Sequence, residues 1–447
     1  FTFEAAEAVC NSDGKLDILE SLTVLVNNSI LRQEESADGE PRFGMLETIR
    51  SYALERLAES GETKTLQAQH AQYFGDAVLN LIGFNIYSAN AVFWLNWLER
   101  EHDNIRATLA WSLTSPQGVE LGAGMVSILF WFWYRRGYFI EGVMWSDRLL
   151  ASPFMKVESS AQMMALMASG LLAVWQGKQD IALAHVQECL AIIQKIDDKQ
   201  WLALILMGNG VVLLNMGRDS DAQPLLAQSH KLFKEQNNAI FQAITLVHLG
   251  NVELGLGHIE QARAYHEEAL GIARLVDENW LIAFALNNLG EVARTQGQYE
   301  PARKYYEECE ALLRASADRG DVARLVHNLG YIAQYEEEFE LAESQFRKSL
   351  TMFRRLGNRR GIAECLAGLA GLKARQGQTE WGATMLSAAE SVLKITGGAW
   401  WPADRVEVER NREMMRSALG TDDFAKAQKT GEAMNMDQAI AFATNET

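Results

Sequence analysis

The strongest constraint on this chain is an internal repeat with a period of 40 residues. The unit from Gly257 to Gly290 recurs before and after itself, with a glycine opening almost every copy. The opening positions are Gly137, Gly177, Gly217, Gly257, Gly297, Glu337 and Gly377, and a second set of small residues lies at Gly170, Gly210, Gly250, Gly290, Gly330 and Ala370. A fixed period of this size predicts an array of about seven units that share one continuous core.

Each unit has the pattern of two helices. Small residues recur five positions after the opening residue, and again seven positions later in most units, at spacings that let two helices approach closely. The first set is Gly142, Ala182, Ala222, Ala262, Ala302, Ala342 and Gly382, and the second is Cys189, Ser229, Ala269, Cys309, Ser349 and Ala389. The opening glycine suits a helix C-terminus, where a positive φ is usual. We therefore predict helices with this period from about Gly122 to Leu393, with Gly250, Gly290 and Gly330 at close helix crossings.

Composition limits the classes of function. The 447 residues are 48% hydrophobic with six prolines, which favours an ordered, mostly helical protein. The 41 basic and 58 acidic residues give a net charge of −17, so direct contact with nucleic acid is not expected. The four cysteines are far apart in the sequence, which is typical of reduced, buried thiols in a cytoplasmic protein.

No stretch of the sequence has the pattern of a membrane span or a reaction centre. The longest uncharged run, residues 121–134, is shorter than the roughly 20 residues of a bilayer span, so a buried helix is expected. His258 and His266 lie near several glutamates, but they are more than two helical turns apart. No catalytic motif, phosphate-binding P-loop or zinc-binding spacing occurs. We therefore predict no catalytic residue, no metal site and no cofactor in this chain.

The first 62 residues differ in kind from the repeats. Two segments with helical spacing precede two short strand-like segments, ILRQEES and EPRFGML, and a further helical segment ends near Gly61. This order predicts a winged-helix module. Its hairpin is rich in acidic residues, so packing against another domain is favoured over DNA binding. The predicted domains are this module (1–62), a helical arm (63–118), the repeats (119–396) and a C-terminal helical linker (397–447).

Two resemblances follow from these motifs. The pairs Leu249-Gly250, Leu289-Gly290 and Leu329-Gly330, with the recurring small residues, resemble tetratricopeptide repeats lengthened from the usual 34 residues. The segment Met45 to Arg50 and its surroundings resemble the winged helix of the signal-transduction ATPases with numerous domains (STAND), which include the maltose-system activator and its LuxR-type relatives. That resemblance implies an ATPase module with ATP and Mg²⁺ upstream and a helix-turn-helix domain downstream. Since the chain starts at Phe1 without a Met, we expect a fragment lacking both.

The resemblance implies an all-α repeat superhelix whose concave groove binds a small-molecule, peptide or protein effector and signals to the parent's ATPase domain. Trp131, Met164, Met167 and Leu171 would make the groove apolar at its N-terminal end. The inward positions of three central units carry polar groups instead: Asn251, Asn287, Glu291, Arg294, Arg324, His327, Tyr331 and Gln334. These residues form the predicted effector site, and an ordinary solvated groove is the alternative for them. The alternative function is a protein-interaction scaffold without a small-molecule ligand.

Overall fold

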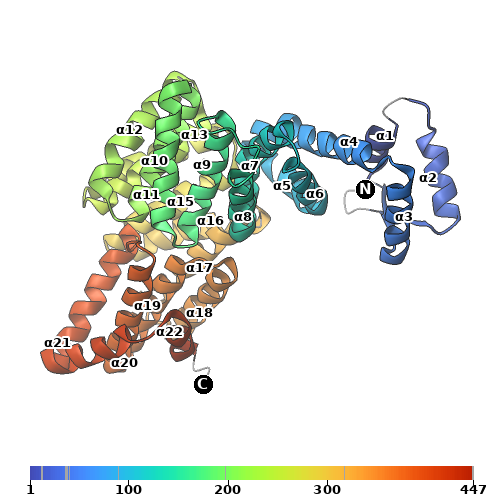
Figure 1. Ribbon diagram of the computed structural model, residues 1–447. Helices are drawn as coiled ribbons and strands as arrows, with labels where there is room; N and C mark the ends of the chain where they lie inside the picture. Colours follow the sequence, from blue (N-terminus) through green and yellow to red (C-terminus); the bar gives the residue numbers. More distant parts are fainter. Residues whose placement is uncertain are drawn as a thin grey trace.

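The computed structural model describes residues 1–11, 14–35, 39, 41–88, 90–196, 198–316 and 318–444. It confirms an all-α superhelix of paired helices behind a small module that contains the two strands (Figure 1). The first helices of the pairs are α7 (Pro116–Arg136), α9 (Ser160–Trp175), α11 (Lys199–Asn215), α13 (Ala239–Gly255), α15 (Asn279–Thr295), α17 (Arg319–Tyr335) and α19 (Arg359–Arg375). The second helices are α8 (Phe139–Leu150), α10 (Gln179–Ile196), α12 (Asp219–Glu235), α14 (Ile259–Leu275), α16 (Tyr299–Ser316), α18 (Phe339–Leu356) and α20 (Thr379–Ile395).

The residue that opens each unit adopts a left-handed backbone conformation. Gly217 and Gly257 have φ of 71° and 86°, in the left-handed region that ends the first helix of a pair. Glu337, the one opening position that is not glycine, adopts the same conformation with φ of 63°. A side chain in this region costs roughly 1–2 kcal/mol. The unit containing Glu337 therefore keeps the turn of its neighbours, although glutamate is less stable than glycine in this conformation.

The small residues on the second helices do more than leave space. Ser229 Oγ donates a hydrogen bond to the carbonyl of Ala203 at 2.8 Å, and Ser349 Oγ donates to the carbonyl of Ala323 at 2.7 Å. The thiols of Cys189 and Cys309 make the same contact in their own units. Each bond joins residues 26 apart and ties the second helix of one unit to the preceding first helix. The 40-residue pattern thus records a repeated polar contact as well as close packing.

The cysteine prediction is correct for three residues and wrong for one. Cys189, Cys309 and Cys365 are buried, and all four thiols are free. Cys10 is exposed, because it ends the first helix of the small N-terminal module, which has little core to cover it. The compositional pattern could not distinguish this cysteine from those inside the array.

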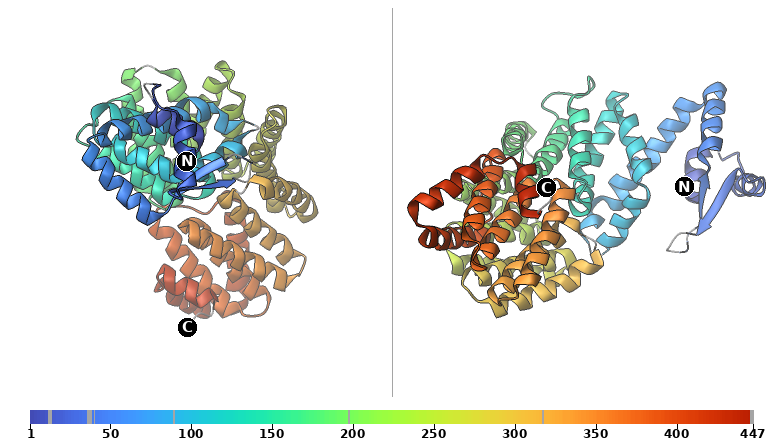
Figure 2. Two further views of the ribbon diagram at one scale, coloured as in Figure 1. Left: turned by 90° about the vertical axis from the view of Figure 1, so that its right-hand side faces the viewer. Right: turned by 90° about the horizontal axis from the view of Figure 1, so that it is seen from below.

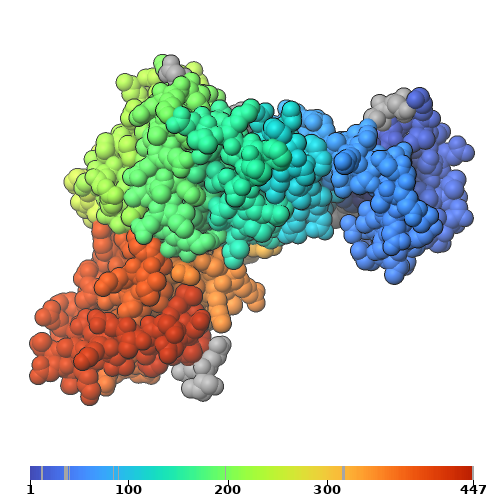
Figure 3. Space-filling view, viewed as in Figure 1, coloured from blue at the N-terminus to red at the C-terminus, as the bar shows by residue number. Residues whose placement is uncertain are grey.

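The N-terminal module has the predicted order of elements. It contains α1 (Phe3–Cys10), α2 (Ile18–Asn27), an antiparallel hairpin of β1 (Leu31–Glu35) and β2 (Pro41–Met45), and α3 (Glu47–Ser60). Its own small core includes Ile18, Leu22 and Leu31. Helix α4 (Thr63–Asp76) carries the module away from the array, as Figures 2 and 3 show. After α4 the chain continues through a π-helical turn (Ala77–Ile82), a 3-10 turn (Gly83–Tyr87), α5 (Ala91–Arg100) and α6 (His102–Ser112).

The uncharged run at residues 121–134 lies in α7 and is largely buried in the core, as predicted. Among the described residues, no helix is both long and apolar enough to cross a membrane.

The last two helices fold back onto the array. Helix α21 (Pro402–Glu432) packs along α20 and also contacts α13, α15 and α19, while α22 (Met436–Thr444) lies on α19 and α20. A break at Gly420, with φ of 75° and ψ of 171°, divides α21 into two parts. The first part is buried at Pro402, Ala403, Asp404 and Glu407, so it fills part of the concave side. The helical linker predicted for this region therefore lies against the array.

The close crossing at Gly290 gives a test of the repeat register. A Cβ on this residue would overlap the ring of Tyr306, which is fully buried. We expect Gly290→Leu to lower the free energy of unfolding by about 1–3 kcal/mol or more, because neither helix can move aside without opening the core. Chemical denaturation measures this change.

The matched control is Gly271→Leu, at an exposed helical glycine whose Cβ would meet nothing within 4 Å. Leucine has the better helix propensity, so stability should stay the same or rise. Equal effects of the two substitutions would contradict the proposed crossing.

Candidate functional site

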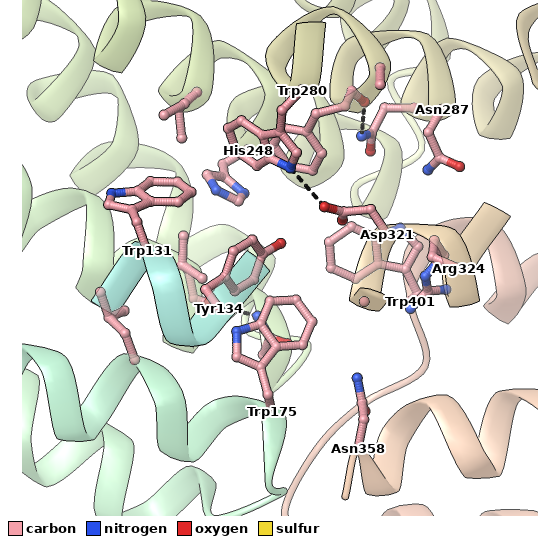
Figure 4. Close-up of a pocket in the computed structure, with 18 of the residues that line it drawn as sticks. Trp131, Tyr134, Trp175, His248, Trp280, Asn287, Asp321, Arg324, Asn358 and Trp401 are labelled. Carbon is pink, nitrogen blue, oxygen red and sulfur yellow. Dashed lines mark hydrogen bonds between the residues drawn. The ribbon is translucent and has the colours of Figure 1, made fainter. Parts of the chain in front are cut away.

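A cavity lies on the concave side of the array, between the first helices of the pairs and the segment that leads into α21 (Figure 4). The cavity has a volume of about 120 Å³. Its walls come mainly from α7, α9, α11, α13, α15 and α17. The principal lining residues are Trp131, Tyr134, Trp175, Val211, Asn215, His248, Trp280, Phe284, Asn287, Asn288, Glu291, Asp321, Arg324, Arg360 and Trp401. The concave side thus contains an enclosed site with a largely aromatic wall.

The aromatic wall is held by ring contacts within α15 and between α7 and two other first helices, α9 and α15. The rings of Trp131 and Trp280 meet edge to face with centroids 5.1 Å apart, and Trp280 stacks on Phe284 at 5.3 Å. Tyr134 lies against Trp175 with centroids 5.4 Å apart. Such contacts fix ring orientation in addition to burying apolar area. The apolar N-terminal end predicted for the groove is therefore present, and Trp131 and Leu171 belong to it.

Asp321 and Glu291 are the acidic groups among the residues that line this cavity. Trp280 Nε1 donates a hydrogen bond to Oδ2 of Asp321 at 2.7 Å. Burial, reinforced by the nearby Asp318 carboxylate, raises the pKa of Asp321 to about 6. Arg135 could have compensated this charge, but it forms a two-point ion pair with Asp318 at 2.6 and 2.9 Å. Among the described residues, no cationic side chain forms an ion pair with Asp321.

The polar end of the concave side is closed by Asp404 of α21. Arg294 Nη2 and Arg324 Nη1 donate to its two oxygens at 2.8 and 2.9 Å, and His327 Nε2 lies 3.3 Å from Oδ1. Burial would raise the pKa of Asp404, but His327 and the two guanidinium groups outweigh burial and hold the pKa well below its usual range. The ionised carboxylate therefore attaches α21 to α15 and α17.

Trp401 joins the closed polar end to the cavity. Its indole Nε1 donates to Glu291 at 2.7 Å, and its backbone N–H donates to Glu364 at 3.3 Å. The guanidinium of Arg360 lies 4.8 Å from its ring centroid, within the range of a cation–π interaction. Trp401 immediately precedes α21 and also lines the cavity, so one side chain contacts both places.

The predicted site residues occupy two connected places. Asn287, Glu291 and Arg324 line the cavity, and Arg294, Arg324 and His327 surround Asp404. The ring of Tyr331 lies under Arg294, 4.4 Å from the guanidinium carbon. Asn251 and Gln334 are buried, and their amide groups have no hydrogen-bond partner among the described residues. The predicted residues therefore fall partly in the cavity wall and partly around Asp404, where α21 covers them.

Several important residues were not predicted. Asp321, Trp280 and His248 lie on the first helices but outside the three inward positions that the repeat pattern selected. Trp401 and Asp404 lie beyond the repeats altogether. His266 packs against Gly250 and His258 pairs with Glu253 at 2.7 Å. Within the described part of the chain, no group of side chains has the composition of a metal site.

Comparisons with known proteins agree with the two structural parts. Residues 1–58 match a winged helix-turn-helix domain family, and residues 241–315 match a tetratricopeptide repeat family. A protein of Mycobacterium tuberculosis (strain H37Rv) and one of Mycobacterium bovis, both named as HTH-type transcriptional regulators, are 29% identical to this chain over 206 residues. The match covers 43% of this chain and 22% of either relative. The chain thus combines a winged helix with tetratricopeptide repeats and is similar to part of these regulators.

The array was also compared with solved structures. A Rap protein in complex with competence and sporulation factor has a TM-score of 0.56 at 13% identity, over 80% of this chain and all of that one. A STAND protein with a tetratricopeptide repeat sensor from Pyrococcus horikoshii has a TM-score of 0.43 at 13% identity, over 96% of this chain and 63% of that one. The first likeness establishes a common superhelical fold for the array.

The ion pairs of Asp404 give a prediction about the stability of the folded chain. Replacing Asp404 by Asn removes the anion beside Arg294 and His327 and leaves Arg324 with Glu364 alone, and breaking a buried ion pair in this way costs about 3–5 kcal/mol. Chemical denaturation should show this loss at neutral pH. The exposed Asp423 lies on the same helix, so Asp423→Asn serves as the control.

The same variant should also change the dependence of stability on pH. Because folding lowers the pKa of Asp404, its contribution is complete above the unfolded value of about 4 and is lost as the pH falls below it. The stability difference between wild type and Asp404→Asn should therefore be largest at neutral pH and shrink in acid. A difference that stays constant through this range would contradict the ion-pair assignment.

Proposed function

We propose that this chain is the sensor region of a larger signal-transduction ATPase that regulates transcription, and that an effector binds on its concave side. The observation that supports this proposal most directly is the aromatic cavity, whose wall includes Trp401 at the start of the helix that closes the rest of the groove. An enclosed, mostly apolar site with a few polar groups is the usual form of a small-molecule site. The similarity to HTH-type regulators gives further support.

The signal would pass from the cavity to α21 through Trp401. An effector changes a conformational equilibrium only as far as it binds the two states with different affinity. A molecule that contacts Trp401 meets this requirement, because the position of the indole depends on its bond to Glu291 and on the attachment of α21. Effector binding would either strengthen or weaken the attachment of α21 to the array. In this proposal, that change is the signal passed to the output domain.

The N-terminal module would communicate with the parent's ATPase domain. Helix α3 has no buried residue, and its apolar side chains Tyr52 and Leu54 are 59% and 52% exposed. In this proposal these exposed apolar side chains contact that domain. In this proposal ATP and Mg²⁺ bind the upstream domain and DNA binds a separate output domain of a cytoplasmic regulator. This chain would have no catalytic role and no nucleic-acid contact.

The alternative function is a protein-interaction scaffold. It is favoured by the exposed apolar side chains of the N-terminal module, which include Leu19 and Val24 of α2 as well as those of α3. A scaffold needs no small molecule in the cavity. The two functions therefore differ in whether occupation of the cavity changes α21.

A cavity-blocking variant tests the sensor function. We expect at least one compound in a library of sugars, amino acids, amines and carboxylates to raise the melting temperature of the wild-type chain. Val211→Phe should abolish this shift, because Val211 lines the cavity and the larger ring would occupy it. The same compound should alter hydrogen–deuterium exchange of residues 401–420.

Leu275→Phe is the matched control, since Leu275 is 86% exposed and lies on a second helix outside the cavity. This variant should respond as the wild type does. If the compound stabilises Val211→Phe equally, or leaves exchange in α21 unchanged, the sensor function is wrong. The scaffold would then be the better explanation.

A further inference from the structure

The cavity wall contains hydrogen-bond acceptors that the protein does not use. Asn215 and Asn288 are 2% and 1% exposed, and the Oδ1 atom of each is buried without a partner among the described residues. Their orientation is fixed, because each Nδ2 donates to a backbone carbonyl one turn earlier, that of Val211 or Phe284, at 2.7 Å. Exchanging oxygen and nitrogen would break these bonds. The unpaired atoms are therefore acceptors, and both residues line the cavity.

Asp321 adds a negative charge to these acceptors. Among the described residues, its side-chain hydrogen-bond partner is the indole of Trp280, and its side chain remains partly accessible. The nearest arginine of α7, Arg135, is already held by Asp318. A carboxylate in an aromatic cavity is far more stable with a cation close by than alone. Glu291, the other acid among the described lining residues, is 1% exposed and already accepts hydrogen bonds from Asn328 and Trp401, so Asp321 is the acid with room for an external cation.

The two cations of the wall do not compete for this role. Arg324 is held between Glu364 at 2.7 Å and Asp404 at 2.9 Å. Arg360 lies 3.6 Å from Glu364 and over the ring of Trp401. Nη1 of Arg360 is buried without a partner, so it can donate a hydrogen bond to an acceptor atom of the ligand. The positive charges are otherwise used within the protein.

His248 contributes a neutral ring nitrogen that can either donate or accept a hydrogen bond. Burial lowers the pKa of His248 to about 4, so the ring is neutral near pH 7. Its Nδ1 is buried without a partner among the described residues. In a neutral imidazole this nitrogen is a donor or an acceptor according to the tautomer. The ring can therefore accept an N–H or donate to a carbonyl of the ligand.

We propose that the cavity binds a small organic cation, a protonated amine joined to an apolar body of one or two rings. The ammonium group lies against Asp321, and its N–H groups or those of the body meet the unpaired amide oxygens. The aromatic wall of Trp131, Tyr134 and Trp280 contacts the apolar body and favours positive charge near its faces. This inference rests on the proposed sensing function and names the chemical class of its effector.

Three probes of similar size and different charge test the proposal by calorimetry. We expect protonated 2-phenylethylamine to bind the wild-type chain at least about tenfold more tightly than the neutral 2-phenylethanol. The anionic 3-phenylpropionate should bind most weakly, since it places its charge against Asp321. Equal or tighter binding of the alcohol or the acid would overturn the inference, as would undetectable binding of the amine at millimolar concentration.

The variant Asp321→Asn should remove the preference for the amine while leaving the alcohol's affinity unchanged. Asparagine keeps an oxygen that can accept the indole N–H, so the cavity should persist. Asp423→Asn, at an exposed site, should behave as the wild type does. An undiminished preference in Asp321→Asn would overturn the inference.

A pH series on the wild-type chain gives an independent readout that needs no variant. The pKa of Asp321 is raised to about 6 by burial and by Asp318, so amine affinity should increase as the pH rises from 5 to 7.5. Of the other groups facing Asp321, Arg135 and Arg324 stay charged, and burial raises the pKa of Tyr134 and Cys309 above this range. Asp318 is held by Arg135. The affinity of the alcohol should not change with pH, and a flat profile for the amine would contradict the proposal.

The two proposals can fail separately. If another compound class stabilises the chain and Val211→Phe blocks it, the sensor function stands and the organic cation is wrong. If nothing in the library occupies the cavity, both proposals fall.

Discussion

The attachment of Asp404 to Arg294, Arg324 and His327 is the interaction on which the concave side depends. These three groups lie on α15 and α17; Arg294 and His327 are buried, and the side chain of Arg324 is 13% exposed. Charged groups in such a place are stable only with a partner of opposite sign. That partner comes from beyond the repeats, 77 to 110 residues further along the chain. The array and its C-terminal helix therefore form one folded unit.

This attachment also sets the shape of the cavity. Because Asp404 holds the start of α21, Trp401 is brought between Glu291 and Glu364, and its ring closes one side of the aromatic wall. Arg324 takes part in both places, with one nitrogen on Asp404 and another on Glu364. A disturbance in the cavity would reach α21 over a few direct contacts. No long pathway through the superhelix is needed for this coupling.

The sequence reveals those parts of the structure that repeat. The left-handed turn of each unit recurs at a fixed position, so Gly257 marks it clearly and even Glu337 can be placed by counting. The inward positions could be counted in the same way, which is why Glu291, Arg294 and Arg324 were predicted to share a surface. The covering of that surface could not be predicted, because Trp401 and Asp404 belong to no repeat. The available signal was chemical: inward-facing arginines among apolar neighbours require acidic partners.

The two ends of the concave side differ in how their acidic groups are paired. Around Asp404, charges of opposite sign meet within ion-pair distance. Around the cavity, Asp321 has no cationic partner among the described residues, and the oxygens of Asn215 and Asn288 beside it are unpaired. A carboxylate shielded from water is costly without a cation, so its place in the cavity wall needs an explanation. An external molecule that supplies donors and a positive charge would explain it, and Trp401 would carry its effect to the end that the chain has already closed.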